Sequence, residues 1–251
     1  MYKLRGNIVK ESIVMILAVT MVLVPVALSG VWTDDFERKT LANEWEFRDR
    51  REKVTKTEVK DGFLRMTNPK GKWAHMTADK AMLERDVPAS SQNLIVSGIF
   101  SSEPEKPVDA WVGMFIFGEE QMDFACLLYG GEANQPQKAL IGSMVQGAWQ
   151  DKGHFQTEFD VPLHLKLEKE KDVFTGYFKQ KEGDDWKQIG NKTWTHKIKK
   201  VKKIGLGIMN NWGGKTVVFL VDSFSLEGEG VQPMAVDSAK KLATAWAELK
   251  R

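Results

Sequence analysis

The feature that most constrains the fold of this chain is the near absence of helical periodicity between residues 30 and 230. Short runs rich in β-branched and aromatic residues stand in its place, separated by clusters of Gly, Pro, Asn and Asp that favour turns. The clearest predicted strands are Phe63–Thr67, Leu94–Ser101, Ala110–Phe117, Met122–Tyr129, Ala139–Gln146, Leu163–Lys169, Val173–Gln180, Ile204–Met209 and Thr216–Leu226. So many short strands predict two stacked antiparallel sheets.

The pattern inside the runs indicates which strands are central. WVGMFIF and FACLLY are apolar along almost their whole length, which is typical of strands buried on both faces in the middle of a sandwich. LHLKLEKEK alternates instead, so we expect its leucines to point inward. We expect the histidines His164 and His196 to face solvent.

Residues 1–29 are predicted to form a secretory signal peptide. Basic residues precede an uncharged stretch, Ile13–Leu28, that is short for a transmembrane helix of about 20 residues. The small residues Ala27 and Ser29 then provide the spacing that a signal peptidase accepts. A retained N-terminal membrane anchor is the alternative. In both cases the rest of the chain is secreted or extracytoplasmic, in the periplasm or at the cell surface.

Residues 231–251 differ from the body of the chain. The linker EGEGVQPM marks the end of a predicted domain over residues 30–230. After it, Asp237 or Ser238 can cap a short amphipathic helix, whose apolar positions are Leu242, Ala245, Trp246 and Leu249. This helix either docks on its own sandwich or binds a protein partner.

Charge and cysteine content exclude some classes of function. The formal net charge is only +2, and the excess lies in the first eleven residues. A protein that binds nucleic acid by neutralising phosphates normally shows a strong basic excess, so we expect no nucleic-acid partner. The single cysteine, Cys126, excludes an internal disulfide and a cysteine-based zinc site.

Three patches of sequence occur in a recognisable order. WTDDF, LANEW and KDGFLRM open the body, VFTGYFKQKEGDDWKQIG follows, and KIGLGIMNNWGGKTVVFLVDSFSLEG closes it. Together they resemble the concanavalin A-like lectin/glucanase superfamily, in particular the secreted laminin-G-like jelly-roll modules of bacteria. The resemblance covers about residues 31–228 and implies an all-β, two-sheet antiparallel jelly-roll sandwich. Together with apolar neighbours it places Trp45, Trp111 and Trp186 in the core.

The resemblance does not fix one function, because the superfamily holds lectins, glycanases and adhesion modules. Its catalytic branch carries E-x-D-x-E, which places three carboxylates on one face of a strand. This chain lacks that motif; its nearest fragments are GEEQMDF and KLEKEKD. Other common hydrolase and phosphate-loop motifs are absent as well. We therefore expect no enzymatic activity, with a glycoside hydrolase that uses an unrecognised site as the alternative.

The tryptophans indicate a function more clearly than the carboxylates do, because an indole offers a flat apolar face and one N–H donor to a sugar ring. Trp149 and Trp212 fall in predicted loops, and Trp212 follows two asparagines. The candidate ligand-binding residues are Trp73, His75, Trp149, Asn210, Asn211 and Trp212. The sequence thus predicts a secreted, non-catalytic, lectin-like module that binds a carbohydrate or polysaccharide by aromatic stacking on the concave sheet or its rim.

Other readings stay open at this point. The chain could instead be an adhesion or scaffold module acting through protein contacts, or could hold an acidic polysaccharide on its lysine run KIKKVKK. No cofactor is expected. A structural calcium ion is the one candidate, at Asp35 and Asp222, because calcium takes carboxylate oxygens and these residues are neighbours if the terminal strands pair, as the resemblance implies.

Overall fold

The computed structural model describes residues 29–48, 55–69, 81–120, 123–132, 134–145, 147–150, 155–157, 159–190, 194–196, 198 and 200–233. The predicted signal segment up to residue 28 and the predicted C-terminal helix lie outside the described residues. Within the described part, no helix is long and apolar enough to cross a membrane.

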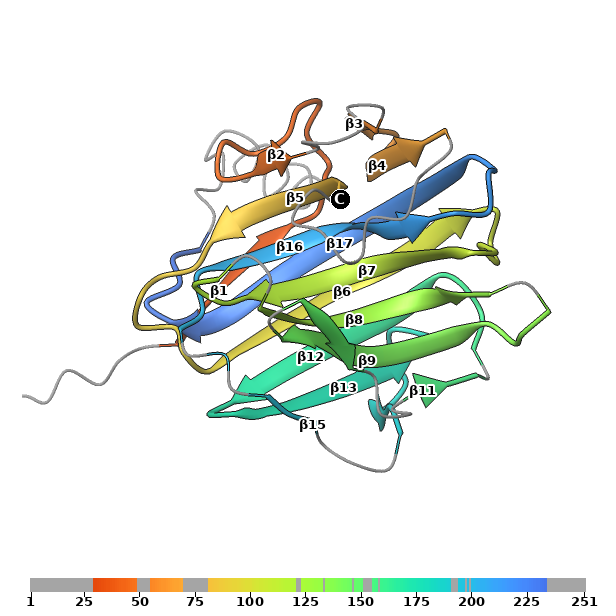
Figure 1. The fold of residues 1–251 in the computed structure, drawn as a ribbon. Helices are drawn as coiled ribbons and strands as arrows, with labels where there is room; N and C mark the ends of the chain where they lie inside the picture. Colours follow the sequence, from red (N-terminus) through yellow and green to blue (C-terminus); the bar gives the residue numbers. More distant parts are fainter. Residues whose placement is uncertain are drawn as a thin grey trace, which may run out of the picture.

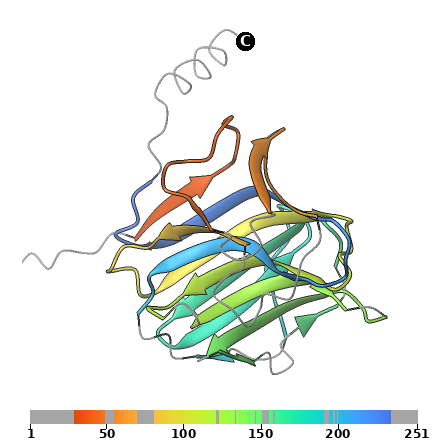
Figure 2. The same cartoon turned by 45° about the horizontal axis from the view of Figure 1, so that its top comes forward.

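The described elements are all strands, arranged in two antiparallel sheets stacked face to face (Figures 1 and 2). Sheet A runs in the order β14 (Lys187–Gln188), β13 (Val173–Lys179), β12 (Leu163–Glu170), β6 (Leu94–Glu103), β17 (Val217–Glu229), β4 (Phe63–Asn68) and β3 (Lys56–Lys60). In addition, β1 (Ser29–Asp34) pairs with β17 and β15 (Trp194–Thr195) pairs with β13.

Sheet B runs in the order β10 (Ala148–Gln150), β9 (Lys138–Val145), β8 (Phe124–Gly131), β7 (Ala110–Phe117), β16 (Lys203–Asn211), β5 (Ala81–Asp86) and β2 (Glu46–Arg48). The two-residue strand β11 (Phe155–Gln156) also pairs with β9. The prediction of an all-β, two-sheet antiparallel sandwich is therefore confirmed, and each predicted strand corresponds to an observed one.

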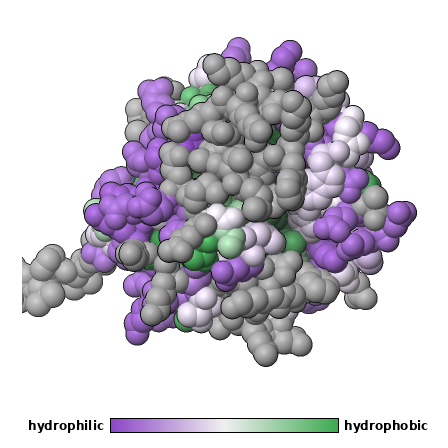
Figure 3. Space-filling model, viewed as in Figure 1, coloured by the Kyte–Doolittle hydropathy of each residue, from purple (hydrophilic) through white to green (hydrophobic). Residues whose placement is uncertain are grey.

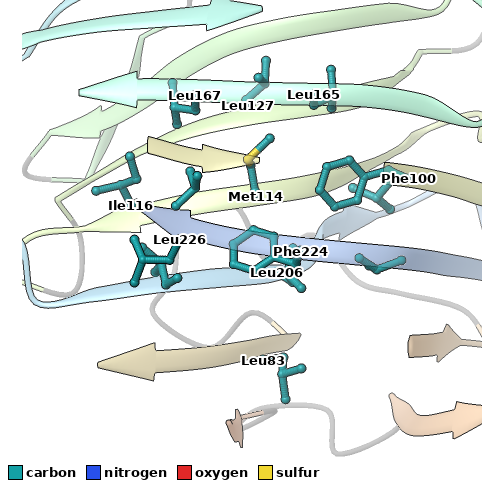
Figure 4. Close-up of a cluster of buried hydrophobic side chains, with 14 of the residues drawn as sticks. Leu83, Phe100, Met114, Ile116, Leu127, Leu165, Leu167, Leu206, Phe224 and Leu226 are labelled. Atoms are coloured by element: carbon teal, nitrogen blue, oxygen red, sulfur yellow. The ribbon is translucent and has the colours of Figure 1, made fainter. Parts of the chain in front are cut away.

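The main core lies between the two sheets. The alternating strand β12 contributes Leu163, Leu165 and Leu167, all fully buried, as the pattern predicts. They meet the even-numbered side chains of β7, such as Met114 and Ile116, which belong to the same cluster of buried residues (Figure 4). Burying one such side chain contributes about 1.5–3 kcal/mol, so this layer supplies most of the stability of the domain.

The start of the sandwich is fixed by one buried carboxylate. Asp34, at the end of β1, accepts hydrogen bonds from the Trp45 indole Nε1 and the Phe36 backbone N–H, both at 3.0 Å. Arg38 Nη2 lies 3.2 Å from the same carboxylate. Trp45 packs edge-on against Trp32 in the main core, where the prediction placed it.

Trp111 is buried as predicted, in a second hydrophobic cluster on the far side of sheet B. Three other predictions about single side chains are wrong. Trp186 is half-buried outside sheet A and does not lie in the core. His164 and His196 were expected to face solvent, yet they are only 8% and 5% exposed. The alternation of β12 does put His164 on the outer face, but neighbouring side chains cover it there.

Candidate functional site

The face of sheet B that points away from sheet A is apolar and forms the candidate site. Along β7 the side chains alternate, so that Val112, Met114 and Ile116 enter the main core while Trp111, Phe115 and Phe117 point outward. We call the second group of buried residues the outer cluster. Its members are Met82, Trp111, Phe115, Phe117, Phe124, Cys126, Leu128, Leu140, Met144 and Met209, with Trp149 packed against them.

The register of the strands places an aromatic row across this face. Phe117 is opposite Phe124, Phe124 is opposite Met144, and Met144 is opposite Trp149. The Phe115, Phe117 and Phe124 rings have centroids 5.6–5.8 Å apart, within the range of favourable aromatic contacts. The row therefore runs from the centre of the sheet to its β10 edge.

Glycines leave gaps between the large side chains on the outer face of sheet B. Gly113 of β7 and Gly207 of β16 are directly opposite each other, so the middle of the face carries no side chain at either position. At Gly142 the ring of Trp149 occupies the empty position, because a Cβ there would lie 2.6 Å from its Cη2 atom. Met82 fills the space at Gly207 in the same way, because its Sδ would clash with a Cβ there. The members of the outer cluster are only 0–8% exposed, and hydrophobic residues show in small areas of the surface drawn in Figure 3.

A group of charged side chains lies on the outer face of sheet B at its β5 side. Glu84 is 2% exposed and pairs with Arg48, while Lys203 Nζ lies 3.9 Å from Glu84 and 3.0 Å from Glu46. Glu46 and Glu84 are directly opposite each other on β2 and β5, which brings their Cβ atoms within about 4.5–5.5 Å. The hydrogen bond and charge of Lys203 lower the pKa of Glu46, so this carboxylate is ionised near neutral pH.

The opposite end of the face has an accessible aromatic rim. Trp212 directly follows β16 and is 37% exposed, and its backbone N–H donates to the Asp109 carbonyl at 2.9 Å. Val108, just before Asp109, is exposed as well. Behind this rim, Asn210 is opposite Trp111; it is 4% exposed and its Oδ1 accepts no hydrogen bond from the described residues. A buried acceptor of this kind is ready for a ligand hydroxyl or a water.

The structure separates the residues that the sequence put together as a binding site. Trp212 lies in a loop as predicted, and Asn210 lies next to it on the outer face. Asn211 points the other way and donates to Asn68 Oδ1 and the Lys215 carbonyl, which gives it a structural role. Trp149 lies in strand β10 and is half-buried, so its predicted loop position is wrong. Trp73 and His75 lie outside the described residues.

Sequence reasoning missed the phenylalanines of the outer cluster and the buried Glu84. The signal for the phenylalanines is present, since WVGMFIF is apolar at both odd and even positions and only one set can face the other sheet. Nothing comparable marks Glu84, because the charges that neutralise it come from β2 and β16, far away in sequence.

The calcium candidates do not form a recognisable site with their surroundings. Asp35 is exposed and accepts the Glu37 backbone N–H at 3.2 Å, and Asp222 lies on β17 at its bulge. Among the described residues, no group of three or more His, Cys, Asp or Glu side chains is placed to hold a metal ion. The calcium ion stays an untested prediction.

This chain resembles known proteins in structure, but the comparisons of its sequence found no match. No family model matches this chain. No curated protein matches its sequence either. The solved structures that it resembles include the xylan β-1,4-xylosidase from Bacillus halodurans C-125, with a TM-score of 0.59 and 16% identity over 78% of this chain and 38% of that one.

Two further likenesses cover nearly the whole of the other protein. The non-specific endo-β-1,3(4)-glucanase SCLam of family GH16 has a TM-score of 0.55 and 14% identity, over 82% of this chain and 92% of that one. The CBM2 module of the evolved Dit of Lactobacillus casei BL23 phage J-1 has a TM-score of 0.55 and 8% identity, over 81% and 97%. At such identities these likenesses establish the sandwich fold.

The comparisons correct one prediction. The lack of E-x-D-x-E led us to expect no enzymatic activity, but the structural neighbours include glycoside hydrolases of families GH43 and GH16. That expectation is contradicted, since the same sandwich occurs within these hydrolases. This chain matches well under half the length of the GH43 proteins.

Proposed function

We propose that this protein engages a carbohydrate chain along the outer face of sheet B. The observation that carries the proposal is the rim of this face, where Trp212 is 37% exposed beside the Asn210 acceptor, which has no hydrogen-bond partner among the described residues. The buried aromatic rings of the outer cluster support this rim from behind. Aromatic faces remove the C–H surface of sugar rings from water, while groups such as Asn210 Oδ1 match their hydroxyls. The xylosidase, the glucanase and the CBM2 module among the structural neighbours support the same class of ligand.

The test uses the two tryptophans that border this face. Trp149 packs on the outer cluster, and Trp212 is exposed at the opposite rim. Replacing either by Ala should weaken binding of xylohexaose or a mixed-linkage β-glucan oligosaccharide by about 1–3 kcal/mol, which is the usual loss for an aromatic anchor. Phe47→Ala is the matched control, because this ring is also 37% exposed but is opposite Leu83 of the main core and is not part of the outer cluster. Unchanged affinity in both outer-face variants, measured by calorimetry, would refute the proposal.

Hydrolysis of the bound glycan is the second candidate function. It is favoured by the glycoside hydrolases among the structural neighbours and by the Glu46–Glu84 pair, which provides two carboxylates on one face. Glycosidases need two carboxyl groups on either side of the scissile bond, about 5–9 Å apart. Release of reducing sugar from β-1,4-xylan and β-1,3(4)-glucan, lost in Glu46→Gln while the fold is retained, would support this role. A rate unaffected by Glu46→Gln would exclude the pair.

We further propose that the protein belongs with the concanavalin A-like, laminin-G-like modules and is exported. The order of the sequence patches supports the first point, and the basic and apolar segments of residues 1–29 support the second. N-terminal sequencing of the protein recovered from its producing cell should give a start at or near Gly30. A protein that still begins with Met1 and sediments with membranes would support a retained anchor instead.

A further inference from the structure

A separate pocket of about 240 Å³ opens on the outer face of sheet A. None of the residues of the outer cluster lines it, because the two faces point away from each other on opposite sheets. The side chains that matter for the argument are Ser97, His164, Lys179, Trp186, Ser223 and Ser225. The pocket is therefore distinct from the glycan face proposed above.

Hydroxyl groups form one half of its floor. Thr33 of β1 is opposite Ser225 of β17, and Ser225 is opposite Ser97 of β6. The hydroxyls of Ser97 and Ser225 lie 2.7 Å apart and bond to each other. Each hydroxyl can donate one hydrogen bond and accept two, so this pair still has capacity for a ligand.

The second half of the floor is the neighbouring row on the same face. His164 of β12 is opposite Ile99 of β6 and Lys179 of β13. Lys179 is buried, and its Nζ donates to the carbonyl of Glu182. The Glu182 carboxylate lies 3.8 Å from Lys179 Nζ and 3.7 Å from His164 Nδ1. A cation, a carboxylate and an imidazole thus line one side.

The segment between β13 and β14 supplies the wall. Trp186 belongs to it, and its ring centroid lies 5.0 Å from Lys166 Nζ and 5.1 Å from Lys179 Nζ. These two lysines hold the indole over the edge of the floor, since an ammonium group close to an aromatic face is attracted to it. The pocket consequently has an apolar wall next to a polar floor.

The balance of charge favours a neutral ligand. Lys179 is matched by Glu182, and burial together with the charge of Lys179 lowers the pKa of His164, so the imidazole is uncharged near neutral pH. The volume lies below the roughly 300–1,000 Å³ of pockets for drug-sized ligands, which limits the occupant to a single ring. A polyhydroxylated ring with an apolar face fits both the hydroxyl floor and the indole wall.

We propose that this pocket on sheet A binds one neutral sugar ring, as a second carbohydrate site on the opposite side of the sandwich from the outer cluster. The proposal does not rest on the function proposed for sheet B, because the two sites share no residue.

The experiment is a titration of the ¹⁵N-labelled protein with methyl β-D-xylopyranoside and methyl β-D-glucopyranoside, followed by amide chemical shifts. The expected result is a saturable shift of the amides around Ser97, His164 and Ser225. Glucuronate, as the charged counterpart, should bind no better than the neutral glycosides. Trp186→Ala and Ser97→Ala should each weaken this binding at least fivefold, and Trp149→Ala on sheet B should change it less than twofold.

Three results would overturn the proposal. One is the absence of shifts around the pocket with both neutral glycosides. Another is saturation by glucuronate alone, which would show that the pocket selects an anion. The third is an affinity unaffected by Ser97→Ala, a substitution that removes one hydroxyl and tests the site even if Trp186→Ala does not fold. Shifts confined to sheet B would reject this pocket and leave the outer-face proposal standing.

Discussion

Removing the Asp34 carboxylate should destabilise the protein severely. In Asp34→Ala the Trp45 indole N–H and the Phe36 backbone N–H, both buried, lose the acceptor they share. A hydrogen bond to a charged group contributes about 1.5–3 kcal/mol, so loss of the two amounts to about 3–6 kcal/mol. That is a large part of the roughly 5–15 kcal/mol that stabilises a typical domain. Trp45→Phe, which loses one of these bonds and keeps a ring, should cost about half as much.

The assay is urea unfolding followed by tryptophan fluorescence and circular dichroism. Asp35→Ala is the matched control, because the Asp35 side chain is exposed and accepts only the Glu37 amide among the described residues. It should cost less than about 1 kcal/mol. If Asp34→Ala lost no more stability than Asp35→Ala, the reasoning that this carboxylate anchors the first strand would be wrong.

Two further predictions concern the histidines and Gly142. Burial is the main cause that lowers the pKa of both His164 and His196 below the ordinary value of 6.5, so the unfolded chain binds more protons and stability should fall as the pH drops through 6.5 towards the folded pKa values. Urea midpoints between about pH 7.5 and pH 5 should show this loss, and a slope unchanged in the double His→Gln variant would contradict it. Gly142→Ala should displace the Trp149 ring, red-shift its emission and weaken glycan binding, because the added Cβ would lie 2.6 Å from Cη2. Gly183→Ala, which has no atom within 4 Å of its added Cβ, should leave both unchanged.

The sequence was sufficient for the strands whose apolar character is continuous or cleanly alternating. Ala110–Phe117 is predicted and observed with the same bounds, because every position of that strand is buried. The strand β5, Ala81–Asp86, was not predicted, since its second half reads as charged loop. In the fold Glu84 is neutralised by Arg48, and Arg85 lies 3.8 Å from the centroid of the Trp32 ring. Such partners come from distant segments, and a local pattern cannot supply them.

The histidines show a similar limit. The alternation of β12 correctly assigns His164 to the outer face, and the error lies only in equating that face with solvent. Trp186 and Glu182, which come from the segment after β13, cover it there. The placement of that segment depends on the pairing of β13 with β12, which brings Lys179 opposite His164. Whether an outward-pointing residue is exposed therefore depends on the neighbouring loops. The pattern of a single strand does not predict where those loops lie.

Odd and even positions of strand β7 face opposite sides of sheet B, and this alternation indicates where the outer cluster lies. The run WVGMFIF has apolar residues at both parities, and the even set, which includes Met114 and Ile116, is used in packing against sheet A. The odd set is Trp111, Phe115 and Phe117, and no strand of sheet A packs against it. The odd set is nevertheless only 0–8% exposed, so it is a second buried layer and not an open apolar surface. The glycan binding proposed above therefore depends on the accessible rim of this layer, where Trp212 is 37% exposed.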